Sequence, residues 1–385
     1  MDYIKILDKV KAKYDILIDK IGADCHFTGN FLENGEPEII NGDIDYIEWV
    51  ASFYTGTALL LYSHYKDEKY LEYVKKMMPL FEKYMEISEA VMHHDGGFLY
   101  ILYSVALYKL TGEKQYREMS IKAAYGLAAR YMVNAHSIGG FGSPHSEKPI
   151  MIVDDMMNIQ LLLWAYHETK NKYFKNIYEE HIGTVIKNFV RDDYSVRHAC
   201  YVSKETGELV GERNWCGYSI GSWWSRGNAW LIFGLSNAVS DILDDYKKDE
   251  YLLTLFENCK AFIGQLDETM IPRWDFRAPE GDKRVDTSAA AIVASAFYKL
   301  NQVSKSNIAV LKSFGMDGVL DGKLEEYADT MIKNIVEKYW ENESEYFVIN
   351  NAFSNDYGFS LWGDYFFVEA LIRKIHGEDA VDFWS

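Results

Sequence analysis

The chain repeats a unit of two helices that differ in where their apolar residues lie. Each unit begins with a turn that contains Gly or Asp, continues as a helix apolar on nearly every face, and ends as an amphipathic helix. A helix that is apolar all round must be buried, whereas an amphipathic helix lies at the surface. The buried helices are predicted to begin near Tyr54, Phe98, Asp154, Gly227, Asp286 and Gly363.

The amphipathic helices supply an outer layer around this core. Five follow the first five buried helices, over residues 68–84, 114–131, 173–189, 251–266 and 324–339, and the sixth is the N-terminal helix at about residues 3–21. This last helix would pack beside the sixth buried helix and close the ring. The predicted fold is therefore all-α: an (α/α)6 barrel of six inner and six outer helices. It forms one domain over residues 1–385, with a short β-hairpin over residues 194–209.

Charge and composition exclude several classes of function. The formal charge of −18 at pH 7 argues against nucleic acid or an anionic membrane surface as a partner, and no apolar run is long enough to span a membrane. The N-terminus lacks the basic and apolar regions of a secretory signal. The four cysteines, Cys25, Cys200, Cys216 and Cys259, form no C-x-x-C pair and indicate free thiols in a reducing, cytoplasmic setting.

The six inner helices would all run in one direction, so their N-termini meet at one end of the barrel, here called the mouth. Converging helix N-termini carry partial positive charge, which favours an anionic ligand despite the net charge of the chain. Polar and aromatic residues gather at these same positions. We therefore expect the functional site at the mouth, built from Trp49, residues 93–95, 154–155 and 223–226, Asp286 and residues 362–364.

Two carboxyl groups at the mouth predict acid–base chemistry. Asp154 and Asp155 precede an apolar helix with no Lys or Arg close by in sequence, and such surroundings raise the pKa of a carboxyl, as suits a general acid. Adjacent helical positions diverge by about 100°, so only one points inward, and we expect it to be Asp154. Asp95, on the neighbouring inner helix, would face it, as paired carboxylates do where glycosidic bonds are cleaved. The alternative is a pair of unrelated helix caps.

Other residues at the mouth have two interpretations each. His198 lies beside the predicted hairpin and is either a structural histidine or a substrate contact. Arg226 either binds a substrate carboxylate in a charge-assisted pair or forms an ion pair with a mouth aspartate. His93 and His94 are too close in sequence for a helical metal pair, and no other spacing indicates a metal ion. The chain is expected to use neither a metal nor another cofactor.

Seven motifs of the chain resemble those of the unsaturated glucuronyl hydrolases of glycoside hydrolase family 88. They occur in the family's order and span the chain from Trp49 to near the C-terminus. They are WVASFYTG at 49–56, HDGGF at 94–98, VDDMMN at 153–158, WSRGNAW at 224–230, PRWDFRAP at 272–279, DTSAAA at 286–291 and WGDYF at 362–366. The unsaturated rhamnogalacturonyl hydrolases of family 105 share the fold and the Trp-x-Arg-Gly element, and they are the near alternative.

This resemblance implies a reaction on the short oligosaccharides that polysaccharide lyases leave. Their terminal uronic acid has a C4=C5 double bond next to the ring oxygen, which makes it a vinyl ether. By analogy, Asp154 protonates C4 and then accepts a proton from the water that adds at C5, after which the hemiketal rearranges and releases the sugar. Asp95 would position sugar hydroxyls and keep the pKa of Asp154 high. The implied substrate-binding residues are Trp49, His94, His198, Trp224, Arg226 and Trp230, with Trp49 and Trp230 as stacking walls.

Two departures from the family pattern concern the leaving sugar. Where many members have a His-Gln pair ahead of the 224–230 motif, this chain has Trp215-Cys216. Residues 351–361 also lack a Ser-rich segment with a lysine, which in the family is associated with sulfated glycosaminoglycan units. Besides an ordinary inverting glycosidase, two other functions remain open for a barrel of this kind. A sugar 2-epimerase would need several inward histidines, and a non-catalytic carbohydrate-binding barrel would bind sugar without turnover.

Overall fold

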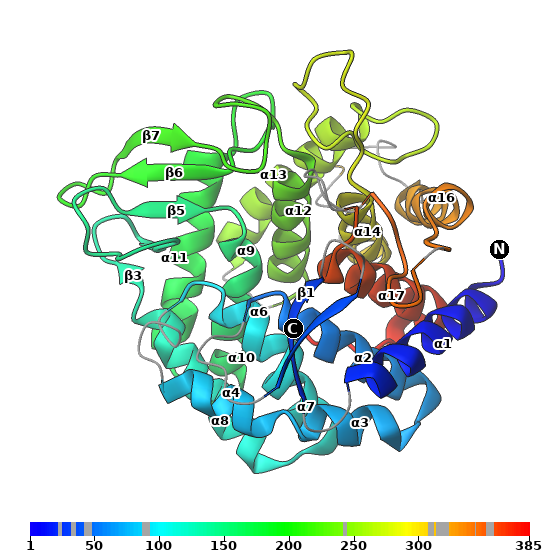
Figure 1. The fold of residues 1–385 in the computed structure, drawn as a ribbon. Coiled ribbons are helices and arrows are strands. Elements are labelled where there is room, and N and C mark those ends of the chain that lie inside the picture. The colour runs from blue at the N-terminus through cyan, green and yellow to red at the C-terminus, as the bar shows by residue number, and fades with distance from the viewer. Residues whose placement is uncertain are drawn as a thin grey trace.

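Six helical segments form a closed inner ring in the computed structural model (Figure 1), which describes residues 1–21, 25–31, 36–41, 48–86, 93–241, 245–306, 312, 323–342, 344–351 and 358–385. Each segment contacts the next around the ring, and the last contacts the first. The segments are α2 (Ala51–Tyr65), α6 (Gly96–Tyr100) with η1 (Ile101–Val105) and α7 (Ala106–Thr111), α9 (Asp155–Asn158) with α10 (Gln160–Thr169), α12 (Ser225–Ser240), α14 (Thr287–Ser306) and α17 (Leu361–His376). All begin close to the predicted positions.

The outer layer also follows the prediction, including the N-terminal helix, which packs against α17. It comprises α1 (Tyr3–Ile21), α3 (Glu68–Lys75) with α4 (Met78–Glu86), α8 (Lys114–Ala128), α11 (Lys172–Phe189), α13 (Asp245–Ile263) and α16 (Lys323–Lys338). Some boundaries differ: α13 begins six residues before the predicted 251, α8 ends three residues before the predicted 131, and the helix predicted over residues 68–84 is interrupted before Met78. Pro79 has no backbone N–H and its ring clashes with the preceding turn, so a continuous helix cannot run through it.

Burial explains which helix lies in which layer. In α12 every residue from Ser225 to Val239 is buried, whereas α1 buries one stripe that includes Leu7, Val10 and Tyr14. A helix buried on all faces has no polar stripe to turn to water, so it must sit inside the ring. The (α/α)6 barrel predicted from the sequence is confirmed. No helix among the residues described is long and apolar enough to cross a membrane.

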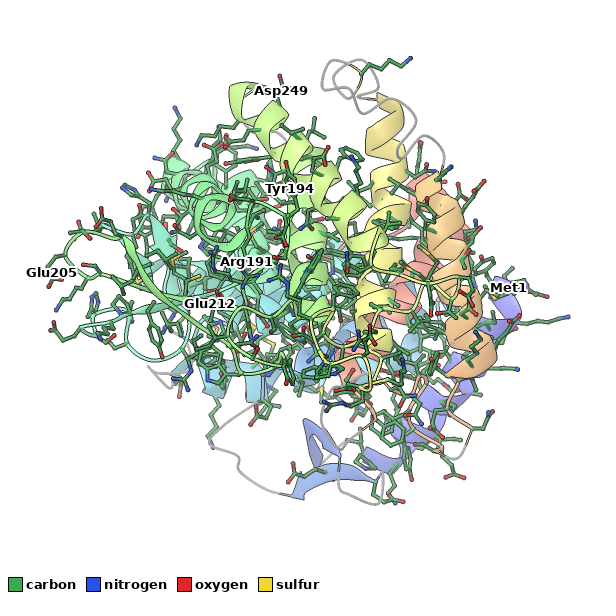
Figure 2. All side chains as sticks on the ribbon, turned by 90° about the horizontal axis from the view of Figure 1, so that it is seen from above. Met1, Arg191, Tyr194, Glu205, Glu212 and Asp249 are labelled. Atoms are coloured by element: carbon green, nitrogen blue, oxygen red, sulfur yellow. The ribbon has the colours of Figure 1, made fainter. Side chains whose placement is uncertain are left out.

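A small antiparallel sheet of order β5-β6-β7 flanks the mouth. The predicted hairpin is present as β6 (Ala199–Val202) and β7 (Leu209–Arg213), but the third strand, β5 (Ile150–Ile152), was not predicted. Glu212 anchors β7, because its carboxylate accepts from Arg191 at 2.7 Å and from Arg197 at 3.2 Å. Arg191 and Glu212 are labelled in Figure 2. Four further strands form two short antiparallel pairs: β1 (Cys25–Phe31) with β2 (Pro37–Asn41), and β3 (Tyr131–Met132) with β4 (Ser137–Ile138).

The C-terminal residues after α17 and η2 (Gly377–Asp379) pack into the barrel, since Phe383 and Trp384 are buried; the C-terminus is marked in Figure 1. Trp384 is fully buried, and its ring contacts Phe98, Phe233 and Phe366 of three inner helices. Lys109, near the C-terminal end of α7, donates to the carbonyl oxygen of Asp382 at 2.7 Å. The C-terminal ends of the inner helices lie opposite the mouth, so this segment closes the other end of the barrel.

Candidate active site

Asp154 stands at the junction between strand β5 and helix α9. The N–H of Val153 donates to the carbonyl oxygen of His198 at 3.0 Å, so the extended β5–β6 pairing sets Asp154 beside His198. Oδ2 of Asp154 lies 4.0 Å from Nε2 of His198. The Asp154 side chain keeps 15% of its surface exposed, whereas that of Asp155 keeps none. Of the two adjacent carboxyls, Asp154 is the one that a substrate can reach.

Neither Asp95 nor Asp154 serves as a helix cap, which was the alternative interpretation of the sequence. They stand immediately before α6 and α9, yet neither side chain accepts a hydrogen bond from the first turn of its helix. Oδ2 of Asp154 is buried and accepts no hydrogen bond from the described part of the chain. A carboxyl oxygen without donors favours the protonated form of the group.

Asp95 and Asp155 are joined by one amide, that of Asn158. Its Nδ2 donates to Oδ1 of Asp95 at 3.4 Å and to Oδ1 of Asp155 at 3.3 Å. His94 completes the network, because its Nδ1 donates to Asp155 at 3.0 Å and its Nε2 lies 3.5 Å from Asp95. Sequence reasoning did not single out Asn158. Its spacing of three residues from Asp155 on a helix, which places both on one face, was the available signal.

A close approach of two backbones holds this network together. A Cβ added at Gly97 would lie 2.2 Å from Cα of Asn158, which no real atom pair tolerates, so only glycine fits between α6 and α9. The contact lets the N–H of Phe98 donate to Oδ1 of Asn158 at 2.8 Å. The second glycine of the His-Asp-Gly-Gly motif therefore fixes the distance between the helices that present Asp95 and Asp154.

The carboxyls of Asp95 and Asp154 have opposite protonation preferences. Burial, together with the charge of Asp95, raises the pKa of Asp154 to about 7. Burial alone would raise the pKa of Asp95 too, but the positive charge of His94 and hydrogen bonds from His93 and Asn158 hold it below its usual value. Burial likewise opposes the charge on His94, yet Asp95 and Asp155 raise its pKa to about 9. Near neutral pH the site thus combines a protonated acid, an anion and a cation.

His198 is a neutral neighbour of Asp154. Burial, with a smaller contribution from the charge of Arg226, lowers its pKa to about 4. The backbone N–H groups of Trp215 and Cys216 donate to Nδ1 at 3.3 and 3.4 Å, and Oδ1 of Asn214 lies 3.2 Å from the same nitrogen. Because two of these three partners donate to Nδ1, this nitrogen acts as an acceptor and carries no proton. The proton of the neutral ring is therefore on Nε2, the nitrogen that faces Asp154.

Arg226 forms an ion pair with a mouth aspartate, Asp286, which is one of the two roles considered for it from the sequence. Its Nη1 lies 2.5 Å from Oδ2 of Asp286, and both side chains are almost fully buried. The guanidinium is flanked by the rings of Trp224 and Trp362, with centroids 4.8 and 5.1 Å from Cζ. Burial raises the pKa of Asp286, although the charge of Arg226 counteracts this. A role of Arg226 in holding a substrate carboxylate stays a prediction.

Three of the expected binding residues differ in exposure. Trp49 is partly exposed and stacks on Trp362, with ring centroids 5.3 Å apart. Trp224 is 3% exposed and lies between His198 and Arg226. Trp230 is 1% exposed, because Phe98 and Phe366 pack against its ring. Trp230 is thus buried among inner-helix rings, and its role as a stacking wall for the sugar stays a prediction.

His94 lies deeper in the site than Trp49. It is 1% exposed, and its Nδ1 is engaged by Asp155, so the histidine supports the carboxylate network, and its contact with the sugar stays a prediction. Sequence reasoning missed the exposed aromatic side chains above it. Phe141 and Trp215 are 46% and 41% exposed, contact each other at 5.3 Å, and touch His94 and His198 at 4.6 and 5.4 Å.

Among the residues described, His93, His94 and Asp95 form the one group of metal-ligating side chains that lie close together. Their candidate ligand atoms are all within 4.8 Å of one another. Hydrogen bonds within the network account for this proximity, because Asp95 accepts from Asn158 while His94 donates to Asp155. We assign no ion to this group.

The chain is similar to named enzymes over most of its length. The sequence profile of Glycosyl Hydrolase Family 88 matches residues 28–367. An unsaturated chondroitin disaccharide hydrolase of Streptococcus agalactiae serotype III is 30% identical over 342 residues, which cover 86% of this chain and 82% of the relative. An unsaturated glucuronyl hydrolase of Bacillus sp. GL1 is 28% identical over 369 residues, 89% of this chain and 91% of the relative.

Solved structures of unsaturated glucuronyl hydrolases have the same fold as this chain. An unsaturated glucuronyl hydrolase of S. agalactiae superposes with a TM-score of 0.83 at 25% identity, covering 100% of this chain and 94% of that one. A variant of an S. agalactiae enzyme complexed with dGlcA-GalNAc6S has a TM-score of 0.76 at 26% identity, covering 97% and 91%. The extent of the profile match and the identity to the relatives lead to one conclusion: the chain belongs to glycoside hydrolase family 88.

Proposed function

We propose that this chain hydrolyses short oligosaccharides that end in a 4,5-unsaturated uronic acid, with Asp154 as the general acid and base. The observation that supports this most is the pairing of Asp154, whose pKa is raised to about 7, with an ionised Asp95. A vinyl ether needs a proton on carbon before water can add, and a carboxylic acid that is still protonated near neutral pH is suited to supply it. The named relatives act on unsaturated disaccharides.

The proposed reaction adds one water across the double bond. Asp154 donates its proton to C4, and positive charge develops at C5 and the ring oxygen. Water then bonds to C5 and gives a proton to the Asp154 carboxylate, which restores the acid. The C5 hydroxyl gives its proton to the ring oxygen as the ring C5–O bond breaks, which leaves a ketone at C5 and a hemiacetal at C1. The hemiacetal then collapses to an aldehyde: the bond from C1 to the leaving sugar breaks, and that sugar's oxygen takes up the hydroxyl proton.

The surrounding groups fit the charge changes of this reaction. The Asp95 anion stabilises the developing positive charge and keeps the proton on Asp154 until the substrate accepts it. His198, as a neutral ring, offers its Nε2 to the substrate without drawing the Asp154 proton away. Trp49, stacked on Trp362, provides a partly exposed aromatic face for the sugar ring.

Replacement of Asp154 by Asn tests the proposal. We expect Asp154→Asn to lower kcat by a factor of about 10² to 10⁴, the usual range for removing an acid–base group. The fold should be kept, since Oδ2 accepts no hydrogen bond from the described residues. The assay follows the loss of ultraviolet absorbance of the double bond, with unsaturated disaccharides from chondroitin, hyaluronan and heparin. Asp249→Asn, at an exposed position, is the matched control.

Two results would contradict the proposal. Full activity of Asp154→Asn would exclude this residue as the acid. No turnover of any unsaturated saccharide by the wild-type protein would exclude the reaction itself, and sugar binding without turnover would point to the carbohydrate-binding alternative.

We also propose a cytoplasmic setting. Within the part of the chain that the structure describes, Cys200, Cys216 and Cys259 form no disulfide, and burial raises the pKa of Cys200 to about 12, which keeps it unreactive. The side chain of Cys25 lies outside the part of the chain that the structure describes. Labelling of free thiols in intact protein from cells would check this setting.

A further inference from the structure

A buried arginine, Arg130, binds the backbone of one loop at the mouth. It follows helix α8 and is 6% exposed, and the loop comprises residues 139–149 between β4 and β5, here called the glycine loop. Nε of Arg130 donates to the carbonyl oxygen of Gly139 at 2.7 Å, and Nη2 donates to that of Gly142 at 2.6 Å and also to that of Gly140. One guanidinium thus gathers three carbonyl groups of the loop.

This arrangement depends on the shape of the guanidinium and on glycine. A guanidinium presents its donors in a rigid plane, whereas the ammonium of a lysine is a compact charge that cannot reproduce this fork. Hydrogen bonds from a charged donor are also stronger than those between neutral groups. Gly142 has a φ of +71°, a conformation that residues with a Cβ rarely adopt. The carbonyl groups therefore converge on Arg130 because the chain supplies both features.

The glycine loop places the ring of Phe141 over the carboxylate network. Phe141 stands between two of the glycines that Arg130 binds, and its ring centroid lies 4.6 Å from that of His94 and 5.3 Å from that of Trp215. His94 in turn lies 3.5 Å from Asp95. Phe141 remains 46% exposed, so its ring offers an apolar face to a sugar that reaches Asp95.

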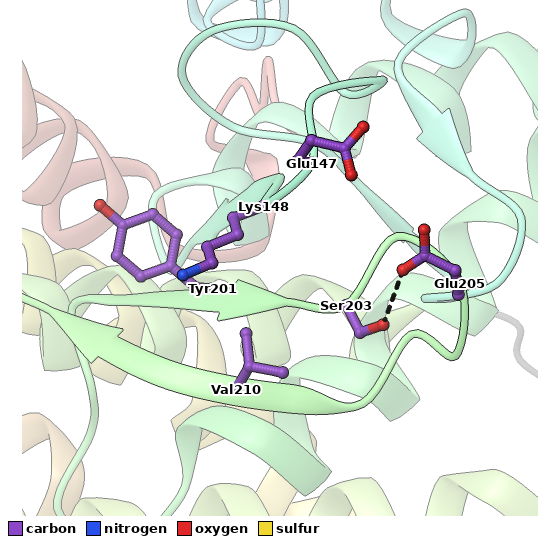
Figure 3. Close-up of a pocket in the computed structure, with 6 residues that line it drawn as sticks. All are labelled: Glu147, Lys148, Tyr201, Ser203, Glu205 and Val210. Atoms are coloured by element: carbon purple, nitrogen blue, oxygen red, sulfur yellow. Dashed lines mark hydrogen bonds between the residues drawn. The ribbon is translucent and has the colours of Figure 1, made fainter.

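The hairpin adds little to the position of this ring. An open groove of about 580 Å³ separates the glycine loop from the hairpin (Figure 3). It is lined by Glu147 and Lys148 of the loop and by Tyr201, Ser203, Glu205 and Val210 of the hairpin. Glu147 pairs with Lys204 at 3.6 Å, but both side chains are well exposed, and surface ion pairs of this kind contribute little. The position of Phe141 is therefore set mainly at the end of the loop that Arg130 binds.

We propose that Arg130 is a positioning residue for substrate binding: its guanidinium holds the glycine loop so that Phe141 presents its ring to the sugar beside Asp95. The inference rests on the proposed function and adds to it a residue that touches no substrate. Burial lowers the pKa of Arg130, and the negative charges of Asp155 and Asp95 counteract this, so charge also links the guanidinium to the carboxylate network. Replacement by lysine keeps the charge and removes the fork, which separates the two effects.

Kinetics of single and double variants test this role, with the unsaturated disaccharide that the wild-type protein hydrolyses fastest. Phe141→Ala should raise KM about tenfold, as for the loss of one aromatic contact, and leave kcat unchanged, since the ring binds substrate and transition state alike. Arg130→Lys should raise KM by a factor of about 3 to 10 and leave kcat and the alkaline limb of the pH profile unchanged. Because both act through one ring, the double variant should be no worse than Phe141→Ala.

Two further variants accompany this series. Arg117→Lys is the matched control, because this arginine of α8 also donates to a backbone carbonyl, that of Glu168 at 3.0 Å, away from the glycine loop. It should leave KM unchanged. Gly142→Ala disturbs the loop without changing a buried side chain, since the added methyl group meets nothing within 4 Å but the φ becomes strained. It should raise KM as Arg130→Lys does, and it should add nothing to Phe141→Ala.

Hydrogen exchange supplies a readout that does not depend on activity. Peptides that cover residues 139–145 should exchange faster in Arg130→Lys than in the wild-type protein or in Arg117→Lys. The amide of Gly140, which donates to the carbonyl oxygen of Ile150 at 2.7 Å, should lose protection. Unchanged exchange would refute the role of Arg130, and this comparison can be made even if the wild-type protein hydrolyses no unsaturated saccharide and the proposed function fails.

Three kinetic results would contradict the inference while the proposed function stands. If the effects of Arg130→Lys and Phe141→Ala multiply in the double variant, the two residues act independently. If Arg130→Lys lowers kcat or moves the alkaline limb, it acts on Asp154 and not on the position of Phe141. If Arg130→Lys leaves KM at the wild-type value, or if Arg117→Lys raises KM equally, Arg130 has no specific role in placing the ring.

Discussion

Oδ2 of Asp154 and Nε2 of His198 lie 4.0 Å apart without forming an ion pair, because burial shifts their pKa values in opposite directions. The acid has a pKa raised to about 7, and the base has one lowered to about 4. At any pH between these values both groups are neutral. A carboxylic acid beside a protonated histidine would lose its proton to form a salt bridge, so the neutrality of His198 is what keeps Asp154 able to protonate carbon.

The first prediction concerns Asp95→Asn and the pH profile. Asp154 must be protonated to act, so kcat/KM should fall as the pH rises through about 7 in the wild-type protein. The negative charge of Asp95 raises the pKa of Asp154, and its removal lowers that pKa. We therefore expect the alkaline limb of the profile to move to lower pH, with a large loss of activity at pH 7. An unmoved limb would show that the two carboxyls are not coupled.

The second prediction concerns His198→Gln, which replaces one neutral hydrogen-bonding group by another. If His198 were a cation, its removal would raise the pKa of Asp154 and move the alkaline limb upward. Because the ring is neutral, we expect kcat/KM to fall while the limb stays near pH 7. The profile is measured with the unsaturated disaccharide that the wild-type protein hydrolyses fastest. A shift of the limb to higher pH would contradict the neutral state of His198.

The distribution of apolar residues along each helix was enough to predict the barrel and to place the carboxyls of Asp95 and Asp154 at its mouth. Helices that are apolar on every face must be inner helices. Because each is followed by an amphipathic outer helix that returns the chain, all inner helices run in the same direction. The residues at their N-termini, Asp95 and Asp154 among them, therefore lie at the same end of the barrel. The divergence of adjacent helical positions also separated Asp154 from Asp155, which is fully buried against His94. These features depend on residues close together in sequence.

Features that depend on distant partners were not predictable. The ion pair of Arg226 joins residues 60 positions apart, and nothing in either segment selects it over a substrate carboxylate. Trp230 looks like a stacking residue in sequence, yet its exposure is decided by Phe366 on another helix. Strand β5 has only three residues, too few for an alternating pattern. The insertion of Trp384 into the barrel likewise leaves no periodic signal.

The third prediction compares Gly97→Ala with Gly96→Ala. A methyl group at Gly97 would meet the backbone of Asn158 at 2.2 Å, and a backbone cannot move aside as a flexible side chain can. We expect Gly97→Ala to lower the free energy of unfolding by about 3 kcal/mol or more, and to lower kcat because α6 and α9 move apart. Gly96→Ala meets nothing within 4 Å and should behave like wild type. Equal stability of both variants in urea denaturation would refute the close approach.

The fourth prediction concerns Trp384→Ala and the closed end of the barrel. Trp384 is fully buried, and its Nε1 donates to Oε2 of Glu369 at 3.0 Å. Removal of the ring leaves a cavity among the inner helices and an unpaired buried acceptor, so the free energy of unfolding should fall by about 3 to 5 kcal/mol. Thermal and urea denaturation measure the change. Tyr218→Ala, at a 52% exposed position, is the control. A stability loss no larger than that of the control would show that the C-terminal segment does not hold the barrel closed.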